Sequence, residues 1–321
     1  MKKITVSIAL ALIVLVSPFT VSAAELLVPG GQVIGLELKN DRVTVAAFDE
    51  SSESPAKNAG LKPGDRITQV DGQTIRCAQD VRQALAQSDG QVALSVQRNG
   101  KTIQIQLRPN ITSDGPRLGV YLKEGVTGVG TVTWCDPENG TFGALGHGVN
   151  DSAGNLLTMD AGRIYGASVV SVKKGQVGKP GQLLGALAEN TPIGVLEKNT
   201  AQGLFGKAEA PFPGEPLPVA ETDEIRIGPA TIRSTIQNQT IQQYSVEIVK
   251  IYPGDRSEGR NMLLKVTDPA LLETTGGIVQ GMSGSPIIQD GKLVGAVTHV
   301  LVNDPTTGYG IFIENMLDAA A

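Results

Sequence analysis

The sequence predicts a mainly β protein, and three observations lead to that class. Glycines are numerous (39 of 321 residues) and aromatic residues few (4%). Short runs rich in Val, Ile and Thr alternate with Gly, Pro and Asn. Asp-Gly or Asn-Gly pairs at 71–72, 99–100 and 290–291 separate apolar runs, which is the sequence signature of β-hairpins. Many short strands with tight turns and no periodic repeat favour barrels or a sandwich.

Length and charge narrow the functional classes. A chain of 321 residues predicts two domains. The net charge of −5 and the lack of a basic block give no indication of nucleic-acid binding. No Cys/His cluster has metal-ligand spacing, so we expect no metal and no cofactor. Cys77 and Cys135 fall in different predicted domains, and both one disulfide and two separate thiols remain open.

The N-terminus has the pattern of an export signal over residues 1–23. Lys2 and Lys3 precede an apolar stretch at 4–16, and Val21-Ser22-Ala23 supplies small residues for cleavage. The apolar stretch is shorter than the roughly 20 residues of a membrane-spanning helix. We therefore expect cleavage after Ala23 or Ala24, with an uncleaved anchor as the alternative. In both cases the rest of the chain lies outside the cytoplasm.

The first domain is predicted at residues 25–109. A Gly-rich loop enters a strand within residues 26–38, followed by a strand at 43–48, a short helix at 54–60 and a hairpin at 66–75. A helix at 78–86 carries Val81 and Leu85 at helical spacing, and 92–98 pairs with 102–107. Ala59-Gly-Leu-Lys-Pro-Gly-Asp65, followed by Ile67-Thr-Gln-Val-Asp-Gly72, resembles a PDZ domain.

That resemblance implies a peptide-binding module. PDZ domains add an extended peptide to a sheet edge, and their carboxylate-binding Φ-Gly-Φ loop would match Ile34-Gly35-Leu36. The peptide could be a free C-terminus or an internal segment, and self-association through this domain is a further alternative. The domain could also pack on the second domain without binding a terminus.

The second domain is predicted at residues 110–321. Strands at 118–122, 126–134 and 141–145 lead to His147, and further strands are expected at 161–172, 192–196, 224–234, 241–252 and 261–266. A Pro-rich loop covers 210–218, and 311–317 closes the fold.

The chemistry-bearing stretch is Gly281-Met-Ser-Gly-Ser-Pro286. Small residues around Ser283 allow a sharp turn that exposes its hydroxyl and aims successive backbone N–H groups at one point. Such N–H groups form an oxyanion hole, which stabilises the charge that develops during acyl transfer. The alternative is an ordinary Gly/Ser-rich turn of a β domain. Taken alone, the motif does not choose between them.

A serine nucleophile needs a base, and the chain has two histidines. His147 lies between glycines, where we expect an accessible turn. His299 lies in an apolar run, where a structural role is the better interpretation, so we favour His147 as the base. The orienting carboxylate could be Asp151, Asp268 or Asp304, and spacing does not choose among them.

A family resemblance adds to this interpretation. GALGHGVND at 143–151, KVTDP at 265–269 and the block from Gly276 to Leu317 resemble the stage IV sporulation protein B (SpoIVB) peptidases. The resemblance implies a PDZ domain before a chymotrypsin-like double β-barrel protease domain. It implies a catalytic triad of His147, Asp268 and Ser283, with Gly281 and Ser283 N–H groups as the oxyanion hole. Ser285 is then not the nucleophile.

The resemblance also implies a biological role. Members are exported serine endopeptidases of endospore-forming bacteria that act in the space between the membranes around the forespore. They perform limited proteolysis, on themselves and on membrane-anchored regulators, which leads to activation of a late sporulation sigma factor. The alternative is a non-catalytic PDZ adaptor at the spore membranes. A quality-control protease of the HtrA kind is disfavoured by its domain order, since that group carries PDZ after the protease.

Overall fold

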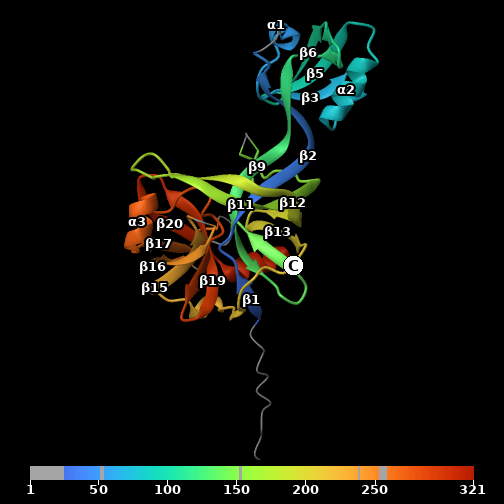
Figure 1. The fold of residues 1–321 in the computed structure, drawn as a ribbon. Helices are drawn as coiled ribbons and strands as arrows, with labels where there is room; N and C mark the ends of the chain where they lie inside the picture. The colour runs from blue at the N-terminus through green and yellow to red at the C-terminus, as the bar shows by residue number, and fades with distance from the viewer. Residues whose placement is uncertain (1–24, 51–53, 152–153, 238, 253–258) are drawn as a thin grey trace, which may run out of the picture.

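A computed structural model describes residues 25–50, 54–151, 154–237, 239–252 and 259–321. The predicted signal segment at 1–23 lies outside the described residues. The chain forms two bodies joined by a two-stranded antiparallel ribbon of β2 (Val33–Phe48) and β9 (Val120–Cys135) (Figure 1). The smaller body holds α1 (Pro55–Asn58), α2 (Ala78–Ala86), β3 (Arg66–Val70), β5 (Val92–Arg98) and β6 (Lys101–Leu107), and the larger body holds the remaining long strands. The mainly β prediction is confirmed.

The first barrel of the larger body has six antiparallel strands that close on themselves. Their order is β2-β9-β10-β13-β12-β11, and the ring closes because β11 pairs with β2. Its strands are β2 (Val33–Phe48), β9 (Val120–Cys135), β10 (Thr141–Ala144), β11 (Ala161–Lys173), β12 (Gln182–Thr200) and β13 (Gly203–Ala208). The short strands β1 (Leu26–Pro29) and β14 (Leu217–Pro218) extend this sheet next to β9. Ile34, Leu36, Phe142 and Ile164 fill its core.

The second barrel is also a closed ring of six strands, in the order β15-β16-β17-β20-β19-β18. Its strands are β15 (Gly228–Thr235), β16 (Ile241–Ile251), β17 (Met262–Val266), β18 (Pro286–Gln289), β19 (Lys292–Leu301) and β20 (Asp304–Phe312). The expected hairpin at Asp290-Gly291 joins β18 to β19, with both residues at positive φ. Two barrels of this kind are the predicted double-barrel architecture, so that prediction is confirmed.

Short helices complete the larger body. They are η1 (Thr222–Glu224), α3 (Pro269–Thr275) and α4 (Ile313–Ala320). Helix α4 buries Ile313 and Met316 against residues of both barrels, including Phe205 and Ile311. None of the helices among the described residues has the length and apolar character needed to cross a membrane.

The smaller body has a core of its own, built from residues between Val43 and Leu118. Its remaining elements are α1 (Pro55–Asn58), β3 (Arg66–Val70), β4 (Gln73–Thr74), α2 (Ala78–Ala86), β5 (Val92–Arg98), β6 (Lys101–Leu107), β7 (Asn110–Thr112) and β8 (Gly115–Arg117). Asp65, 1% exposed, binds Arg98 through two bonds of 2.6 Å, which ties the loop before β3 to the end of β5. This pair lowers the pKa of Asp65 against the opposing effect of burial.

The strand pairing differs from a division into residues 25–109 and 110–321, because the smaller body is inserted into the first barrel. Val33–Leu38 of β2 pair with Val126–Thr131 of β9 inside the barrel, and the same strands continue pairing as Val43–Phe48 with Val120–Glu124 in the smaller body. Residues 26–38 therefore belong to the barrel. Sequence order suggested consecutive domains, whereas strand pairing joins segments on either side of the insertion.

The predicted peptide-binding loop Ile34-Gly35-Leu36 is corrected by the same pairing. These residues lie inside β2 with β9 on one side and β11 on the other. Both edges of the strand are occupied, and Ile34 is fully buried. A carboxylate-binding loop needs unpaired N–H groups, so this segment cannot serve as one.

Candidate active site

The turn that carries Ser283 lies where the two barrels meet. Gly281 and Gly284 adopt φ values of +99° and +95°, which other residues rarely tolerate. A Cβ on Gly284 would lie 2.1 Å from the Thr131 carbonyl oxygen of the first barrel. Glycine is therefore required at 284 both for the turn and for the close approach of the barrels. We refer to residues 280–286 as the catalytic turn.

The catalytic turn presents two unused backbone donors. Met282 N–H donates to Val279, Gly284 N–H to Val297 and Ser285 N–H to Met282. By contrast, no hydrogen bond of the described backbone uses the N–H of Gly281 or Ser283. Unpaired N–H groups flanking an exposed serine can bind an oxyanion. The geometry agrees with the predicted oxyanion hole at Gly281 and Ser283.

Two strands of the first barrel hold this turn in place. The Leu183 N–H donates to the Gln280 carbonyl at 2.8 Å, which fixes the peptide plane whose N–H belongs to Gly281. Thr131 donates its hydroxyl to the Gly281 carbonyl at 2.8 Å and its N–H to the Ser283 carbonyl at 3.0 Å. The carbonyls are thus turned away from the cleft. Sequence analysis did not identify Thr131 or Leu183.

Ser283 is the more accessible serine of the catalytic turn. It is partly exposed, and its hydroxyl donates to the Thr298 carbonyl at 2.7 Å. Ser285 is fully buried and its Oγ bonds to Ser234 Oγ at 3.1 Å. The contrast agrees with the prediction that Ser283, and not Ser285, is the nucleophile. Rotation of the Ser283 hydroxyl away from Thr298 is needed before it can reach a base.

A sharp turn at the end of β10 positions His147. Leu145 and Gly146 both have φ of +69°, and the Leu145 N–H donates to the Thr131 carbonyl. His147 Nδ1 lies 3.0 Å from the Gly148 carbonyl. This contact favours the tautomer that donates from Nδ1 and leaves Nε2 with the lone pair a base requires. Burial lowers the pKa of His147, so the neutral form is favoured.

His299 stands beside His147, which the sequence did not reveal. The two ring centroids are 5.0 Å apart, with a tilt of 37° between the planes. His299 Nδ1 is buried without a hydrogen-bond partner. Burial, followed by His147 and Arg260, lowers the pKa of His299 to about 4. The predicted structural role in a strand is therefore incomplete, because a neutral His299 forms one wall of the site.

The structure does not bring Asp268 to His147. Asp268 is the N-cap of α3, where its carboxylate accepts from Leu271 N–H at 3.0 Å and Ser245 N–H at 3.3 Å. His299 pairs with Tyr309, which pairs with Leu263 of β17. Asp268 lies five residues beyond Leu263, about 17 Å along an extended chain. Its assignment as the orienting acid remains a prediction that these contacts do not support.

The other two acidic candidates are also engaged elsewhere. Asp151 pairs with Arg42 at 3.3 Å. Asp304 accepts from the hydroxyls of Thr306 and Thr307 at 2.6 Å, and these bonds lower its pKa. Among the described residues, no carboxylate bonds to either histidine. The orienting contact that the structure does provide for His147 is the Gly148 carbonyl.

Asn199 anchors the loop that follows His147. Its Oδ1 accepts from Val149 N–H at 2.9 Å, and its Nδ2 donates to the carbonyls of Val149 at 2.9 Å and Leu157 at 2.8 Å. One amide side chain thus fixes the backbone two residues beyond the base. No local signal in the sequence identified Asn199, because its partners lie about 50 residues away.

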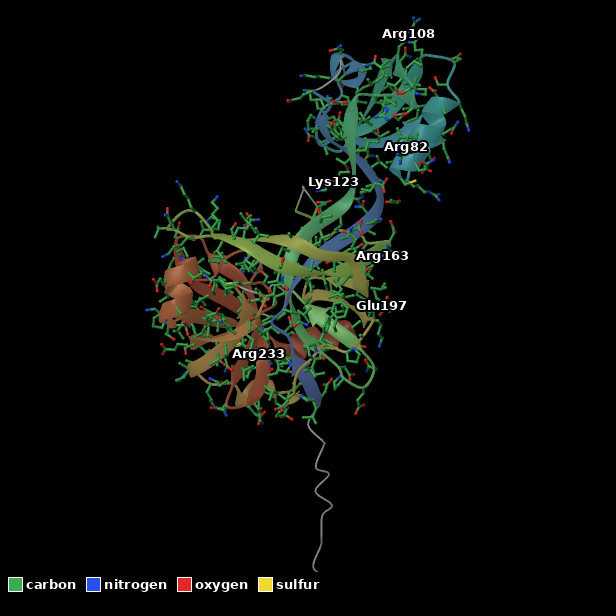
Figure 2. The ribbon with its side chains drawn as sticks, viewed as in Figure 1. Arg82, Arg108, Lys123, Arg163, Glu197 and Arg233 are labelled. Carbon is green, nitrogen blue, oxygen red and sulfur yellow. The ribbon has the colours of Figure 1, made fainter. Side chains whose placement is uncertain are left out.

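The smaller body has a groove that replaces the one predicted at Ile34–Leu36. It lies between α2 and the start of β9 and has a volume of about 690 Å³. Leu118-Gly119-Val120 repeats the Φ-Gly-Φ pattern at its end, with Gly119 at φ +71°. No described backbone hydrogen bond uses the N–H of Leu118 or Gly119. Arg82 of α2, labelled in Figure 2, also lines this groove.

Comparisons with known proteins show which families and structures this chain is similar to. The family described as SpoIVB peptidase S55 matches residues 114–317, and a PDZ domain matches residues 49–98. The Rv3671c protease of M. tuberculosis, in its inactive form, has 13% identity, a TM-score of 0.36, and coverage of 59% of this chain and 81% of that chain. The PDZ domain of an SdrC-like protein from Listeria monocytogenes has 23% identity, a TM-score of 0.23, and coverage of 27% and 92%.

Curated relatives match only in part. A putative zinc metalloprotease of Brucella suis is 32% identical over 127 residues, which is 39% of this chain and 32% of that protein. Another from Rhizobium meliloti is 26% identical over 161 residues, covering 48% and 42%. The chain thus spans less than half the length of these relatives. No group of side chains suited to a metal ion occurs among the residues that the structure describes.

The site combines a serine on a glycine turn, two N–H groups that no bond of the described backbone uses and a histidine whose pKa is lowered, and groups of this kind are suited to acyl transfer. The family match extends over 204 of 321 residues, from 114 to 317, and contains every one of these groups. The chain therefore belongs to the SpoIVB peptidase S55 family, with a PDZ domain inserted into the first barrel of its protease.

Proposed function

We propose that this serine endopeptidase performs limited proteolysis in sporulation signalling, outside the cytoplasm, on itself and on membrane-anchored regulators. The family membership supports this role, as does the signal pattern at residues 1–23. Ser283 attacks the peptide carbonyl, His147 accepts its proton at Nε2 and returns it to the leaving amine, and the N–H groups of Gly281 and Ser283 stabilise the oxyanion.

The observation that carries the chemistry is the pair of unused N–H groups beside Ser283. A structural Gly/Ser turn would satisfy its own donors, because buried N–H groups without partners are rare. Here the neighbouring donors of Met282, Gly284 and Ser285 are all paired, while those of Gly281 and Ser283 are not. This difference between paired and unpaired N–H groups supports an enzyme over the adaptor alternative.

The test uses the chain from Ala24 to Ala321, followed by intact mass over time and by labelling with a fluorophosphonate. We expect the label on Ser283 and serine-dependent shortening of the chain. Ser283→Ala should abolish both, and Ser285→Ala should keep the label. Equal shortening of wild type and Ser283→Ala would refute self-cleavage, and a wild type that neither labels nor cleaves a protein substrate would refute the enzyme.

We further propose that the groove at Leu118–Val120 binds the C-terminus of a protein partner. The unused N–H groups of Leu118 and Gly119 suit a carboxylate, and Arg82 supplies positive charge in the same groove. The edge of β9 at Val120–Leu122 suits an added strand, since β2 is the one strand among the described residues that pairs with β9 there.

Phage-displayed C-terminal peptides on the full chain would test this groove. A Cβ at Gly119 would lie 2.8 Å from Ser54 Cα, so Gly119→Ala should distort the loop and abolish capture. Arg82→Gln should weaken capture without changing the fold. Peptides that bind equally well after C-terminal amidation would favour internal segments instead.

A further inference from the structure

A second pocket lies on the outer face of the first barrel, where β2, β9, β11 and β12 come together (Figure 1). Its volume is about 520 Å³. Ile34 and Leu36 point into the barrel core, so Gly35 between them faces outward. Val129 and Tyr165 pair with Gly35 on either side and share this outward face. The pocket is therefore on the barrel exterior and open to a ligand.

Two of the strands that line the pocket, β9 and β12, also contact the catalytic turn. Thr131 and its partner Val33 occupy the same outward face of β9 and β2, and Thr131 bonds to the carbonyls of Gly281 and Ser283. Val129 is the next residue of β9 on that face, about 7 Å from Thr131. On the other wall, Leu183 bonds to Gln280, and Gly185 is two residues further along β12. Both walls thus start at the turn and lead away from Ser283.

The position of β19 indicates which half of a substrate meets this pocket. Beyond Val297, β19 pairs only with β20 among the described strands, so one edge from Thr298 to Leu301 is free. Thr298 also holds the Ser283 hydroxyl. The acyl half of a peptide can add to this edge. Its leaving half then passes over Gly281 toward Leu183 and the pocket.

The lining of the pocket indicates that it suits an aliphatic side chain of the substrate. Val129, Ala167, Ala186 and Leu187 form its walls. Glu37 at the rim already accepts from the Tyr165 hydroxyl at 2.9 Å and pairs with Lys39 at 3.4 Å. The charge of Glu37 is compensated, so the pocket does not favour a cationic side chain of the substrate.

We infer that this pocket is a specificity subsite that receives an aliphatic side chain of the substrate on the leaving side of the cut bond. Two residues of extended peptide span about 7 Å, which is also the spacing along β9 between Val129 and Thr131, the residue that contacts the catalytic turn. The second residue after the cut bond therefore reaches it. This inference rests on the proposed endopeptidase activity. It adds a preference for an aliphatic residue after the cut bond, which the activity alone does not imply.

The experiment is a cleavage-site profile on a digested proteome, read by mass spectrometry, for wild type and three variants. We expect Val, Leu, Ile or Met to be enriched at the second position after the cut. Ala167→Leu fills the pocket and should lower the aliphatic-to-glycine ratio there about tenfold, since one or two methylenes change specificity by roughly 10- to 200-fold. Leu187→Ala opens the pocket and should admit aromatic residues.

Leu184→Ala is the matched control. Leu184 lies on the same strand with similar exposure (45% against 51% for Leu187) but does not line the pocket, so its profile should equal that of wild type. Fluorophosphonate labelling of each variant confirms that Ser283 is intact. If Ala167→Leu and Leu187→Ala leave the residue preference at the second position after the cut unchanged while Ser283 is still labelled, the subsite is refuted and the proposed function is not. A wild type without label or cleavage would overturn the proposed function as well.

Discussion

The hydroxyl of Thr131 donates to the carbonyl of Gly281 at 2.8 Å across 150 residues of sequence. Thr131 is fully buried, and its N–H and carbonyl bind Ser283 and Leu145. One residue of the first barrel therefore fixes the catalytic turn and the strand end before His147. At its other end, the same strand β9 lines the groove of the PDZ domain.

Thr131→Val is expected to reduce turnover about tenfold or more, because the Gly281 carbonyl loses its donor and the turn can reorient. Loss of a buried hydrogen bond of this kind also costs about 1–3 kcal/mol of stability. Steady-state kinetics and thermal unfolding would measure the two effects.

Thr133→Val is the control for this prediction. Thr133 lies on the same strand and is fully buried, but its hydroxyl has no hydrogen-bond partner. We expect neutral or slightly higher stability and normal turnover. Equal turnover in Thr131→Val and Thr133→Val would contradict a positioning role for Thr131.

The variant Asp268→Asn distinguishes a helix-capping role of Asp268 from a role as the acid that orients His147. Asparagine is as good an N-cap as aspartate, so the cap of α3 should persist and activity should remain near that of wild type. An orienting acid predicts instead a loss of roughly 10⁴ in kcat. Asp268→Ala should lower stability by about 1 kcal/mol. A loss of that size in Asp268→Asn, with unchanged thermal unfolding, would restore Asp268 to the triad.

Asn199→Asp tests the anchor of the His147 loop. The substitution keeps an acceptor for Val149 N–H but removes the Nδ2 donor to the carbonyls of Val149 and Leu157. We expect a fall in kcat with little change in KM, and lower stability by about 1–3 kcal/mol. Activity at the wild-type level would show that the loop holds His147 without this amide.

The pH profile should show a base that works below neutrality. The pKa of His147 is lowered by burial, and only its neutral form accepts a proton, so activity should rise through a midpoint below the ordinary value of 6.5. A midpoint above 6.5 in kcat/KM would point instead to a carboxylate beside His147.

Stability should also depend on pH through His299. The unfolded chain takes up this proton near 6.5 and the folded chain near 4, so stability falls as pH drops between these values, by a few kcal/mol at most. His299→Gln should flatten that part of the profile in urea unfolding. An unchanged slope would exclude His299 as its source.

The sequence by itself determined the local features. Glycines around Ser283 and His147 fixed the two sharp turns, and Asp-Gly and Asn-Gly pairs fixed hairpins, because turn geometry depends on neighbouring residues. The class of fold was predictable on that basis, whereas the choice of Ser283, His147 and the oxyanion-hole donors also drew on the family resemblance.

Only the tertiary structure decided which distant segments meet. Pairing of β2 with β9 moved Ile34–Leu36 out of the PDZ domain and made Leu118–Val120 its loop. Packing of the barrels placed His299 beside His147 and Thr131 behind the catalytic turn. These outcomes depend on strand register and on contacts across 100 or more residues, such as the 150 between Thr131 and Gly281, which no local pattern encodes.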